Sequence, residues 1–463
     1  MRLRVLLVIL AVLVAVLAVR PVFLRSDQRP IGLPVDVLVV GGSPAGVAAS
    51  LAAARQGMIV VLVEPRPFLG TVMTGAMLNM VDLSRRSDTG GHLIKGIFFE
   101  AYSRFGGITF DPRKVRDVFR TMVDAEPGIT LMLKTELVRP LVEDGRVIGA
   151  VVRAHEGEET TIHAVITVDA TDDGDLAAAA GVPFLYGREG SGIDRRAMPA
   201  TLLFRVEGVD WREIVRYAYA HRREKQPSGA YSGYAWGFTL AMRDYKAEDP
   251  RLSAHDLNIG KMADGTVWIH SLQIRDVDGT SRASRIDAYE RAKREIPHLV
   301  EYLRANAPGF ERAKLVEVAP ELYIRETRHL QGLYTLTARD IVTSTRFWDR
   351  IGAASYPVDL HQYTKGERYP YRPVRREYTI PLRSLITAKV DGLFVASRAF
   401  SATYQAAGSA RVIPTTMAIG EGVGAAAAVA IQRKVTPHRL AERRDLLREI
   451  QQRLIRAGAV IDF

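Results

Sequence analysis

The stretch VDVLVVGGSPAGVAASLAAARQGMIVVLVE, residues 35–64, decides the fold. Residues 35–40 are apolar and β-branched, as expected for a buried parallel strand. The Gly-rich turn GGSPAG (41–46) follows and leads into an Ala-rich helix that we expect to end near Gly57. A second short strand, 59–63, ends just before an acidic residue. This order of strand, turn, helix, strand and acid is typical of a dinucleotide-binding βαβ unit.

Each part of the turn has a physical reason to be present in such a unit. One glycine allows the tight turn, another lets helix and strand pack closely, and the backbone amides at the start of the helix face a pyrophosphate. The acid at the end of the second strand can accept a hydrogen bond from a ribose hydroxyl. A serine replaces the usual middle glycine, and its small Cβ hinders but does not forbid close approach of a phosphate. The predicted cofactor contacts of this unit are Gly41, Gly42, Ser43, Ala45, Gly46 and Glu64.

Three later stretches extend this pattern. They are FLGTVMTG (68–75), VDATDDGD (168–175) and LFVASRAFSATYQAAGSARVIPTTMAIGEGVGAAAAVA (393–430). Together with the first unit they make residues 35–455 similar to the FAD-dependent oxidoreductase family with a glutathione-reductase-type FAD-binding domain. The resemblance implies FAD as the cofactor and further contacts at Gly70, Thr71, Ala170, Thr171, Ser397, Gly408 and Arg411. The chain departs from the family pattern where Thr71, Asp172 and Ser397 replace glycines.

The residues of the last stretch agree with that interpretation. Residues 392–396 predict a buried strand, and 408–411 predict a small-residue turn. Pro414 suits the first position of a following helix, whose three glycines at 420, 422 and 424 leave one face thin. The positive end of this helix would point at the flavin edge that becomes negative on reduction.

The fold class that follows is α/β, with a Rossmann-like FAD-binding domain (a parallel sheet with a β-meander) and an inserted α+β substrate domain. We place the FAD domain at 35–195 and 386–435, the substrate domain at 196–385, and a C-terminal helix and tail at 436–463. The predicted elements between these ends are a helix at 111–126, meander strands at 129–133, 137–142, 147–154 and 160–168, strands at 201–209 and 267–274, and a helix at 286–306.

The N-terminus resembles a targeting segment. Arg2 and Arg4 precede an apolar run from 5 to 19, which Arg20 closes. We predict a signal peptide or N-terminal membrane anchor at 1–25 and a linker at 26–34, and therefore a membrane-anchored or exported protein. An uncleaved anchor, a cleaved signal and a peripheral cytoplasmic helix all remain open. The orientation also remains open, because basic residues flank both ends of the run.

Composition excludes several other classes of protein. The 463 residues include 63 Lys and Arg and 52 Asp and Glu, a formal net charge of +11, but the basic residues are scattered and predict no nucleic-acid partner. The absence of cysteine excludes disulfides, thiolate nucleophiles and iron–sulfur clusters. Histidines lack paired metal-ligand spacing, so we predict no metal. Walker and GxSxG motifs are missing, and no second dinucleotide loop is evident.

The candidates for substrate chemistry lie in two later segments. Arg325 and Arg328 could hold a substrate carboxylate or an anionic flavin, and His361 could accept or donate a proton with help from Tyr334. A structural ion-pair network is the competing explanation for the arginines. The function predicted is an FAD-dependent oxidoreductase whose flavin takes a hydride from an unidentified small organic molecule and passes electrons to an unknown acceptor. The alternatives are an NAD(P)-binding dehydrogenase and a catalytically silent, membrane-attached flavin- or ligand-binding protein.

Overall fold

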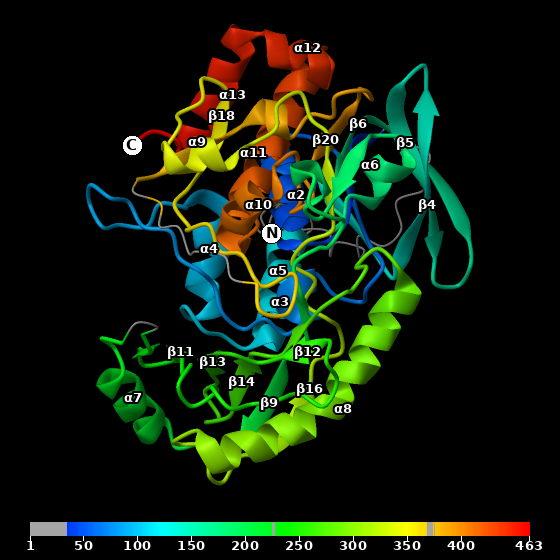
Figure 1. Cartoon of the computed structure of the whole chain (residues 1–463). Coiled ribbons are helices and arrows are strands. Elements are labelled where there is room, and N and C mark those ends of the chain that lie inside the picture. The colour runs from blue at the N-terminus through cyan, green and yellow to red at the C-terminus, as the bar shows by residue number, and fades with distance from the viewer. Residues whose placement is uncertain (1–34, 225–226, 368–373, 375) are drawn as a thin grey trace, which may run out of the picture.

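The structure is a computed structural model that describes residues 35–224, 227–367, 374 and 376–463 (Figure 1). The predicted anchor (1–25) and linker (26–34) lie outside these residues. The molecule has two halves, each built on one large sheet. The larger half is in the upper part of Figure 1 and the smaller half lies below it. Apolar side chains from both halves join in one continuous buried core.

The larger half is built on a seven-stranded sheet of order β3-β2-β1-β6-β5-β4, with β20 paired to β6. Strands β1, β2, β3, β20 and the end of β6 are parallel, while β4, β5 and the start of β6 form the antiparallel meander. The first two strands are apolar except for Asp36 in β1 and Glu64 at the end of β2, because both of their faces are covered. The bounds are β1 Val35–Val40, β2 Val60–Glu64, β3 Ile129–Leu133, β4 Thr135–Glu143, β5 Arg146–Ala154, β6 Glu159–Asp169 and β20 Leu393–Val395. The Rossmann-like sheet with its meander is thus confirmed, except that the stretch 129–133, predicted as a meander strand, is the edge strand β3 and pairs in parallel with β2.

Two helices from opposite ends of the chain pack against each other on this sheet. They are α2, Pro44–Ala54, and α11, Ile413–Gln432. A Cβ added at Gly420 would lie 2.1 Å from the Ala45 carbonyl oxygen, so the two backbones are in direct contact. This confirms the thin face predicted for the later helix. Among the described residues, α11 alone is long and apolar enough to cross a membrane, yet 94% of its most apolar window is buried inside the protein.

One prediction in this region is wrong. The segment from Gly408 to Arg411 is not a turn, because a short helix, α10 Tyr404–Ala410, runs through most of it. The Thr403 side chain caps this helix by accepting a hydrogen bond from the Ala406 amide. Gly408 is small for packing rather than for a turn, since an added Cβ would meet the Asp359 carbonyl oxygen at 3.0 Å.

The smaller half contains a six-stranded sheet of order β10-β11-β13-β14-β9-β16 and a three-stranded sheet of order β12-β15-β8. The long helix α8, Arg282–Asn306, borders it (Figure 1), and Ser281 caps that helix. The remaining bounds are β8 Ala200–Thr201, β9 Phe204–Glu207, α7 Trp211–Ala220, β10 Gly229–Ala230, β11 Tyr234–Gly237, β12 Leu252–Ser253, β13 Leu257–Lys261, β14 Val267–His270, β15 Gln273–Ile274 and β16 Lys314–Val318.

Each of the two long strands predicted here is split. The stretch 201–209 is divided between β8 and β9, and the stretch 267–274 between β14 and β15. The reason is that β9 pairs with β14 in the six-stranded sheet, whereas β8 pairs with β15 in the three-stranded sheet. The two neighbouring segments, 200–207 and 267–274, therefore pass between the six-stranded and the three-stranded sheet side by side.

The chain returns to the larger half before the second segment of the predicted FAD domain begins. Strand β17, Arg328–Leu330, pairs with β7, Phe184–Tyr186, and β18, Arg350–Ala354, pairs with β19, Tyr378–Pro381, and packs on α11. The predicted domain boundaries stay predictions. The other bounds are α3 Thr71–Thr74, α4 Gly96–Phe105, α5 Pro112–Asp124, α6 Asp175–Ala179, α9 Ala338–Val342, α12 Pro437–Glu442, α13 Arg444–Arg456, η2 Glu189–Ser191 and η3 Leu382–Ser384.

Candidate cofactor and substrate site

The turn between β1 and α2 brings three pieces of backbone together. Gly41 has a φ of +109°, and a Cβ there would lie 2.4 Å from the carbonyl carbon of Ala170. A Cβ at Gly46 would lie 2.0 Å from the carbonyl oxygen of Gly41. The loop after β2 joins them, because the Gly70 amide donates to the carbonyl of Gly42 at 2.7 Å. Glycine is therefore required at 41 and 46 on geometric grounds, as predicted.

The structure explains how Ser43 can replace the middle glycine of the usual turn. Its φ is −62°, so the backbone needs no glycine there. The buried hydroxyl donates to the Ala170 carbonyl at 2.9 Å and accepts from the Gly46 amide at 3.2 Å. The side chain thus caps α2 and ties its start to the end of β6.

Glu64 ends β2 and is buried. Its Oε2 accepts from the Gly42 amide at 2.7 Å, and its Oε1 accepts from the Arg66 amide at 2.9 Å and the Arg66 guanidinium at 3.0 Å. Burial raises the pKa of Glu64 even though Arg66 opposes the shift. The acid is therefore held in place beside the turn, at the position the sequence predicts.

A cavity of about 840 Å³ runs along this turn. One wall belongs to the larger half, and α8 of the smaller half forms the other through Arg282, Arg285 and Tyr289. The predicted cofactor residues on its wall are Gly41, Glu64, Thr71, Ala170 and Thr171. A cavity of this size with both polar and apolar lining residues is the kind of space that a cofactor occupies.

A second cavity, of about 40 Å³, lies where the turn meets the C-terminal segment. Val72, Asp172 and Arg398 line both cavities, so the two are adjacent. The predicted cofactor residues on its wall are Ser43, Ala45, Ser397 and Arg411. The first turn and the C-terminal helix therefore share one groove, as predicted.

The start of α11 faces this smaller cavity through Val412, Ile413 and Thr416. Val412 precedes the helix and provides no side-chain cap. The positive end of the helix dipole is thus directed at the cavity without a capping acceptor from the chain.

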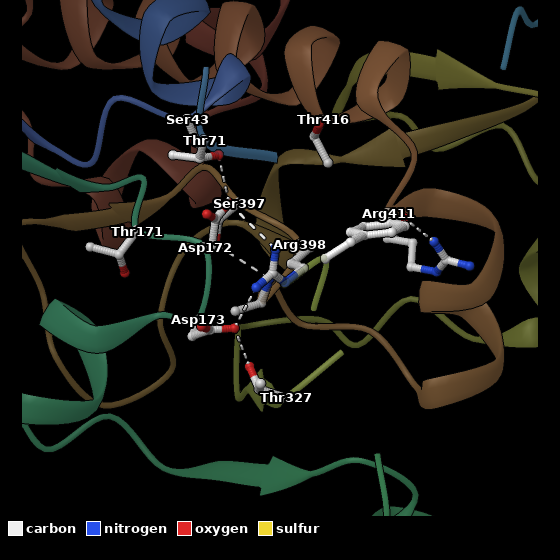
Figure 2. A network of polar contacts seen from close by, with 12 residues as sticks. Ser43, Thr71, Thr171, Asp172, Asp173, Thr327, Ser397, Arg398, Arg411 and Thr416 are labelled. Carbon is white, nitrogen blue, oxygen red and sulfur yellow. Dashed lines mark hydrogen bonds and ion pairs between the residues drawn. The ribbon is translucent and has the colours of Figure 1, made fainter. Parts of the chain in front are cut away.

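Arg398 lines both cavities and was not predicted. Figure 2 shows its guanidinium between Asp172 and Asp173. Its Nη2 donates to Asp173 at 2.7 Å, and its Nη1 lies 3.5 Å from Asp172. Thr71 and Thr327 hold the same two carboxylates through their hydroxyls at 3.3 and 2.6 Å. Burial would lower the pKa of Arg398, but Asp173 and Asp172 raise it. Its place directly after Ser397, at the end of a buried strand, is the one sequence signal for it.

The residues present fit FAD. Gly41 and Gly46 form a backbone cradle that has no room for side chains. The two cavities share lining residues and are therefore adjacent. Within the described part of the chain, the buried Nε atoms of Arg398 and Arg411 have no hydrogen-bond partner. Unpaired buried donors of this kind match an acceptor-rich group such as a pyrophosphate or a flavin carbonyl edge.

Two of the four predicted substrate residues lie in one cluster: Arg325 lines the smaller cavity, and His361 lies near Arg325 and Asp359 without lining either cavity. The Nε2 of His361 lies 3.5 Å from Asp359, and its Nδ1 lies 3.4 Å from the Gln273 amide nitrogen. Arg325 donates to the Pro199 carbonyl, contacts His270 and lies over the Tyr323 ring at 4.8 Å. Burial, and next Arg325, lower the pKa of His361, so its imidazole is neutral.

The other two predicted residues are held elsewhere. Arg328 donates to the Asp173 carbonyl at 2.9 Å and to Asp175 at 2.7 Å. The Tyr334 hydroxyl donates to Asp340 at 2.9 Å, within the capping box of α9. Neither lines the two cavities. The structure thus does not bring Arg328 and Tyr334 to Arg325, and it instead brings Asp82 and Tyr323 to the cavity wall that Arg325 lines, for which the sequence offered no motif.

These features define the class of protein: an α/β enzyme with a dinucleotide groove between its first βαβ turn and a C-terminal helix. The family model described as "FAD dependent oxidoreductase" matches residues 36–454, and the chain belongs to this family. It is therefore an FAD-dependent oxidoreductase, and FAD rather than NAD(P) is its cofactor. The glutathione-reductase-type detail stays a prediction.

Several characterised proteins are similar to parts of the chain. A digeranylgeranylglycerophospholipid reductase of Methanosphaerula palustris is 29% identical over 231 residues, 45% of this chain and 53% of the relative. The enzyme of the same name from Thermoplasma volcanium is 27% identical over 153 residues, 29% of this chain and 38% of the relative. The chain thus spans about half the length, or less, of these curated relatives.

Solved structures are similar over more of the chain. A geranylgeranyl bacteriochlorophyll reductase-like protein from Thermoplasma acidophilum has a TM-score of 0.44 and 14% identity, covering 92% of this chain and 84% of that one. A p-nitrophenol 4-monooxygenase from Pseudomonas putida has a TM-score of 0.44 and 12% identity, covering 92% and 88%.

Proposed function

We propose that the chain oxidises a small organic molecule at the smaller cavity and passes the electrons on to a second acceptor. The observation that carries this is the shared groove, because Ser43 and Ala45 on one side and Arg411 and Thr416 on the other line one cavity. When bound there, FAD supplies two-electron acceptance. The residues described below supply binding, orientation and electrostatics.

The residues of the larger half would hold the cofactor. The amides at the start of α2 and the guanidinium of Arg398 are the donors for a diphosphate, and Glu64 is the acceptor for a ribose hydroxyl. The start of α11 and Arg411 put positive potential on the smaller cavity. Such fixed positive charge favours a ring that becomes negative, since it needs no rearrangement when the charge arrives.

His361 is our candidate for handling a substrate proton. Burial and Arg325 lower its pKa, which favours the neutral ring, and Asp359 beside Nε2 would stabilise the charge when the ring takes up a proton. We keep Arg325 as a residue that shapes this cluster. We assign Arg328 and Tyr334 supporting positions, because their hydrogen bonds hold Asp173 and the α9 cap.

We also propose that the N-terminal segment tethers or exports the protein. Its support is the apolar run at 5–19 between basic residues. Fractionation of cells expressing the whole chain tests this, because a tethered protein remains in the membrane pellet after a high-salt wash. Recovery in the soluble cytoplasmic fraction would refute it.

The absorbance spectrum of the purified full chain tests the proposed function. We expect flavin bands after reconstitution with FAD, and bleaching of those bands when an anaerobic panel of organic donors is added. Bands that persist with every donor would instead support the catalytically silent alternative. His361→Gln should retain the bands but bleach more slowly, whereas His155→Gln, remote on the meander, serves as a control.

The names of the relatives favour a second direction of reaction, namely reduction of a digeranylgeranylglycerophospholipid. The lining of the smaller cavity argues against an isoprenoid chain at that point, since Asp82, Arg325 and Arg411 all face it. Bleached flavin that is reoxidised by a geranylgeranyl lipid would establish this second candidate.

A further inference from the structure

A third cavity lies outside the cofactor site, and we call it the distal cavity. Its volume is about 860 Å³, and it is bounded by the ends of α2 and α13, the start of α4 and the middle of α11. None of its lining residues lines either cofactor cavity. On α2, Ala45 lines the smaller cavity and Ala52 the distal one, about 10 Å further along the helix axis.

The buried part of the lining of the distal cavity is apolar except for one side chain. Ala52, Ile97, Ala425 and Leu454 are each at most 6% exposed, and the exception is Glu421. The volume lies within the range of small-molecule sites in proteins. Hydrocarbon laid on this surface would be removed from water, which favours binding in proportion to the area covered.

Most charged groups around the cavity neutralise one another. The ion pairs are Arg55 with Glu100 and Glu126, Arg104 with Glu100, and Arg433 and Arg453 with Glu449. Each of the carboxylates at positions 100 and 449 thus has two guanidinium partners. Neither carboxylate is left without a counter-ion for a ligand to neutralise.

Two exposed cations on the lining have no acid partner among the described residues. They are Lys95 and Arg456. Lys95 is the N-cap residue of α4 and makes no capping bond, so its charge lies at the positive end of a helix, where the dipole opposes it. Arg456 donates through Nε to the Gln452 carbonyl at 3.2 Å, and its position in the last turn suits the negative end of α13. The helix geometry therefore explains Arg456 but not Lys95.

Glu421 is 3% exposed and has no cation partner within the described part of the chain. Its Oε2 accepts from the Ile97 amide at 3.1 Å, and a Cβ on Gly96 would lie 2.3 Å from the same oxygen. Burial raises the pKa of Glu421 to about 7, although the Ile97 amide and Arg55 oppose the shift. A carboxyl that is readily protonated at neutral pH can be covered by hydrocarbon at little cost.

We propose that the distal cavity binds an amphiphile, with a hydrocarbon tail on the buried apolar lining and an anionic head at Lys95 and Arg456. A cationic head would meet two unpaired cations, and an anion without a tail would leave the apolar lining uncovered. This site is separate from the cofactor groove and goes beyond the function proposed above.

The experiment compares four probes, each below its micelle concentration, titrated by calorimetry into the FAD-reconstituted full chain at pH 6.5. They are decyl sulfate, decyltrimethylammonium, 1-decanol and inorganic sulfate. Bound FAD fills the dinucleotide groove, so the sulfate head finds no free site there. We expect decyl sulfate to bind at least about tenfold more tightly than each of the other three probes.

Hydrogen exchange locates the bound probe. Decyl sulfate should slow exchange in peptides covering 95–100 and 449–458, with no change in a peptide covering 42–47. Protection confined to other peptides would place the probe outside the distal cavity and overturn the proposal.

Two matched pairs of variants test the head and the cavity separately. Lys95→Gln should weaken decyl sulfate binding about tenfold, whereas Lys314→Gln, exposed on β16 of the smaller half, should leave it within a factor of two. Ala457→Trp fills the cavity from an exposed lining position and should also weaken binding about tenfold. Ala220→Trp, exposed at the end of α7, is its control. Equal melting temperatures within each pair would show that the variants are folded.

The pH dependence of binding tests the part played by Glu421. It is protonated below its pKa of about 7 and ionised above it, and a hydrocarbon tail favours the protonated form. Affinity for decyl sulfate should therefore fall from pH 6 to pH 8, by up to about tenfold, and Glu421→Gln should flatten the profile. The charged side chains on the helices around Glu421 are Arg55, Lys95, Glu100, Glu449 and Arg453.

Several results would overturn the proposal. They are tighter binding of decyltrimethylammonium or 1-decanol than of decyl sulfate, no measurable binding of decyl sulfate, unchanged binding in Lys95→Gln or Ala457→Trp, and an affinity that rises from pH 6 to pH 8. Failure of the proposed oxidoreductase function would look different, because the flavin bands would then be missing or would never bleach.

Discussion

The two walls of the smaller cavity are built in different ways. On one side, Ala45 lies at the start of α2, and Ser43 and Val412 directly precede α2 and α11, so the wall is made of backbone, small side chains and helix ends. On the other side, Asp82 and Tyr323 come from irregular segments and carry charge or hydroxyl groups. The first wall is suited to a cofactor whose shape is constant. The second wall is suited to specificity, which can change by side-chain replacement on loops.

Arg398 joins the two cavities, and its removal should have the largest effect. Arg398→Met leaves Asp172 and Asp173 without their buried cation, and we expect the free energy of unfolding to fall by about 3–5 kcal/mol. Chemical denaturation of the reconstituted protein measures it. Arg439→Met is the control, because that side chain is 75% exposed and its pair with Glu442 contributes little. Equal stability of the two variants would show that the Arg398 network is not structural.

Gly46→Val breaks the cofactor wall alone. The new Cβ would lie 2.0 Å from the Gly41 carbonyl oxygen, so α2 must shift, at a cost of about 1–3 kcal/mol. FAD affinity, measured by fluorescence quenching, should fall at least about tenfold because the amides move with the helix. Gly91→Ala is the control, since its Cβ meets only a threonine hydroxyl at 3.4 Å. Unchanged FAD affinity in Gly46→Val would show that the turn between β1 and α2 does not bind the cofactor.

Tyr334→Phe should have the smallest effect. It removes one hydrogen bond to Asp340 in the α9 cap, which costs about 1 kcal/mol of stability. Bleaching of the flavin should proceed at the parental rate, measured by stopped-flow absorbance, because the Tyr334 hydroxyl is held by Asp340 in the α9 cap rather than by the cluster around His361. A loss of bleaching rate comparable to that of His361→Gln would show that Tyr334 does take part in the substrate site.

The comparison of the walls also explains what could be predicted from the sequence. Gly41, Gly46 and Glu64 have roles imposed by backbone geometry, and such roles leave a motif at fixed spacing. Gly408 shows the limit of such prediction. Close packing against Asp359 and a tight turn both require a small residue, so the sequence does not distinguish them. The split of 267–274 into two strands was also invisible, since it depends on a partner strand far along the chain.

The substrate wall left no comparable signal. Asp82 lies in an irregular segment, and only the tertiary fold brings it near Asp359 and Arg411. Arg325 and Arg328 are three residues apart, yet one faces the cavity and the other pairs with Asp175. Their closeness in sequence therefore suggested that both arginines bind one group, but their side chains point to different places.

The central claim is that FAD lies in the groove shared by the β1–α2 turn and the start of α11. Hydrogen exchange of the full chain, followed by mass spectrometry with and without FAD, tests it most directly. We predict slower exchange in peptides covering both 42–47 and 412–417 on addition of FAD, with no change in peptides from α7. FAD that binds while either of those two peptides exchanges at its original rate would contradict the claim.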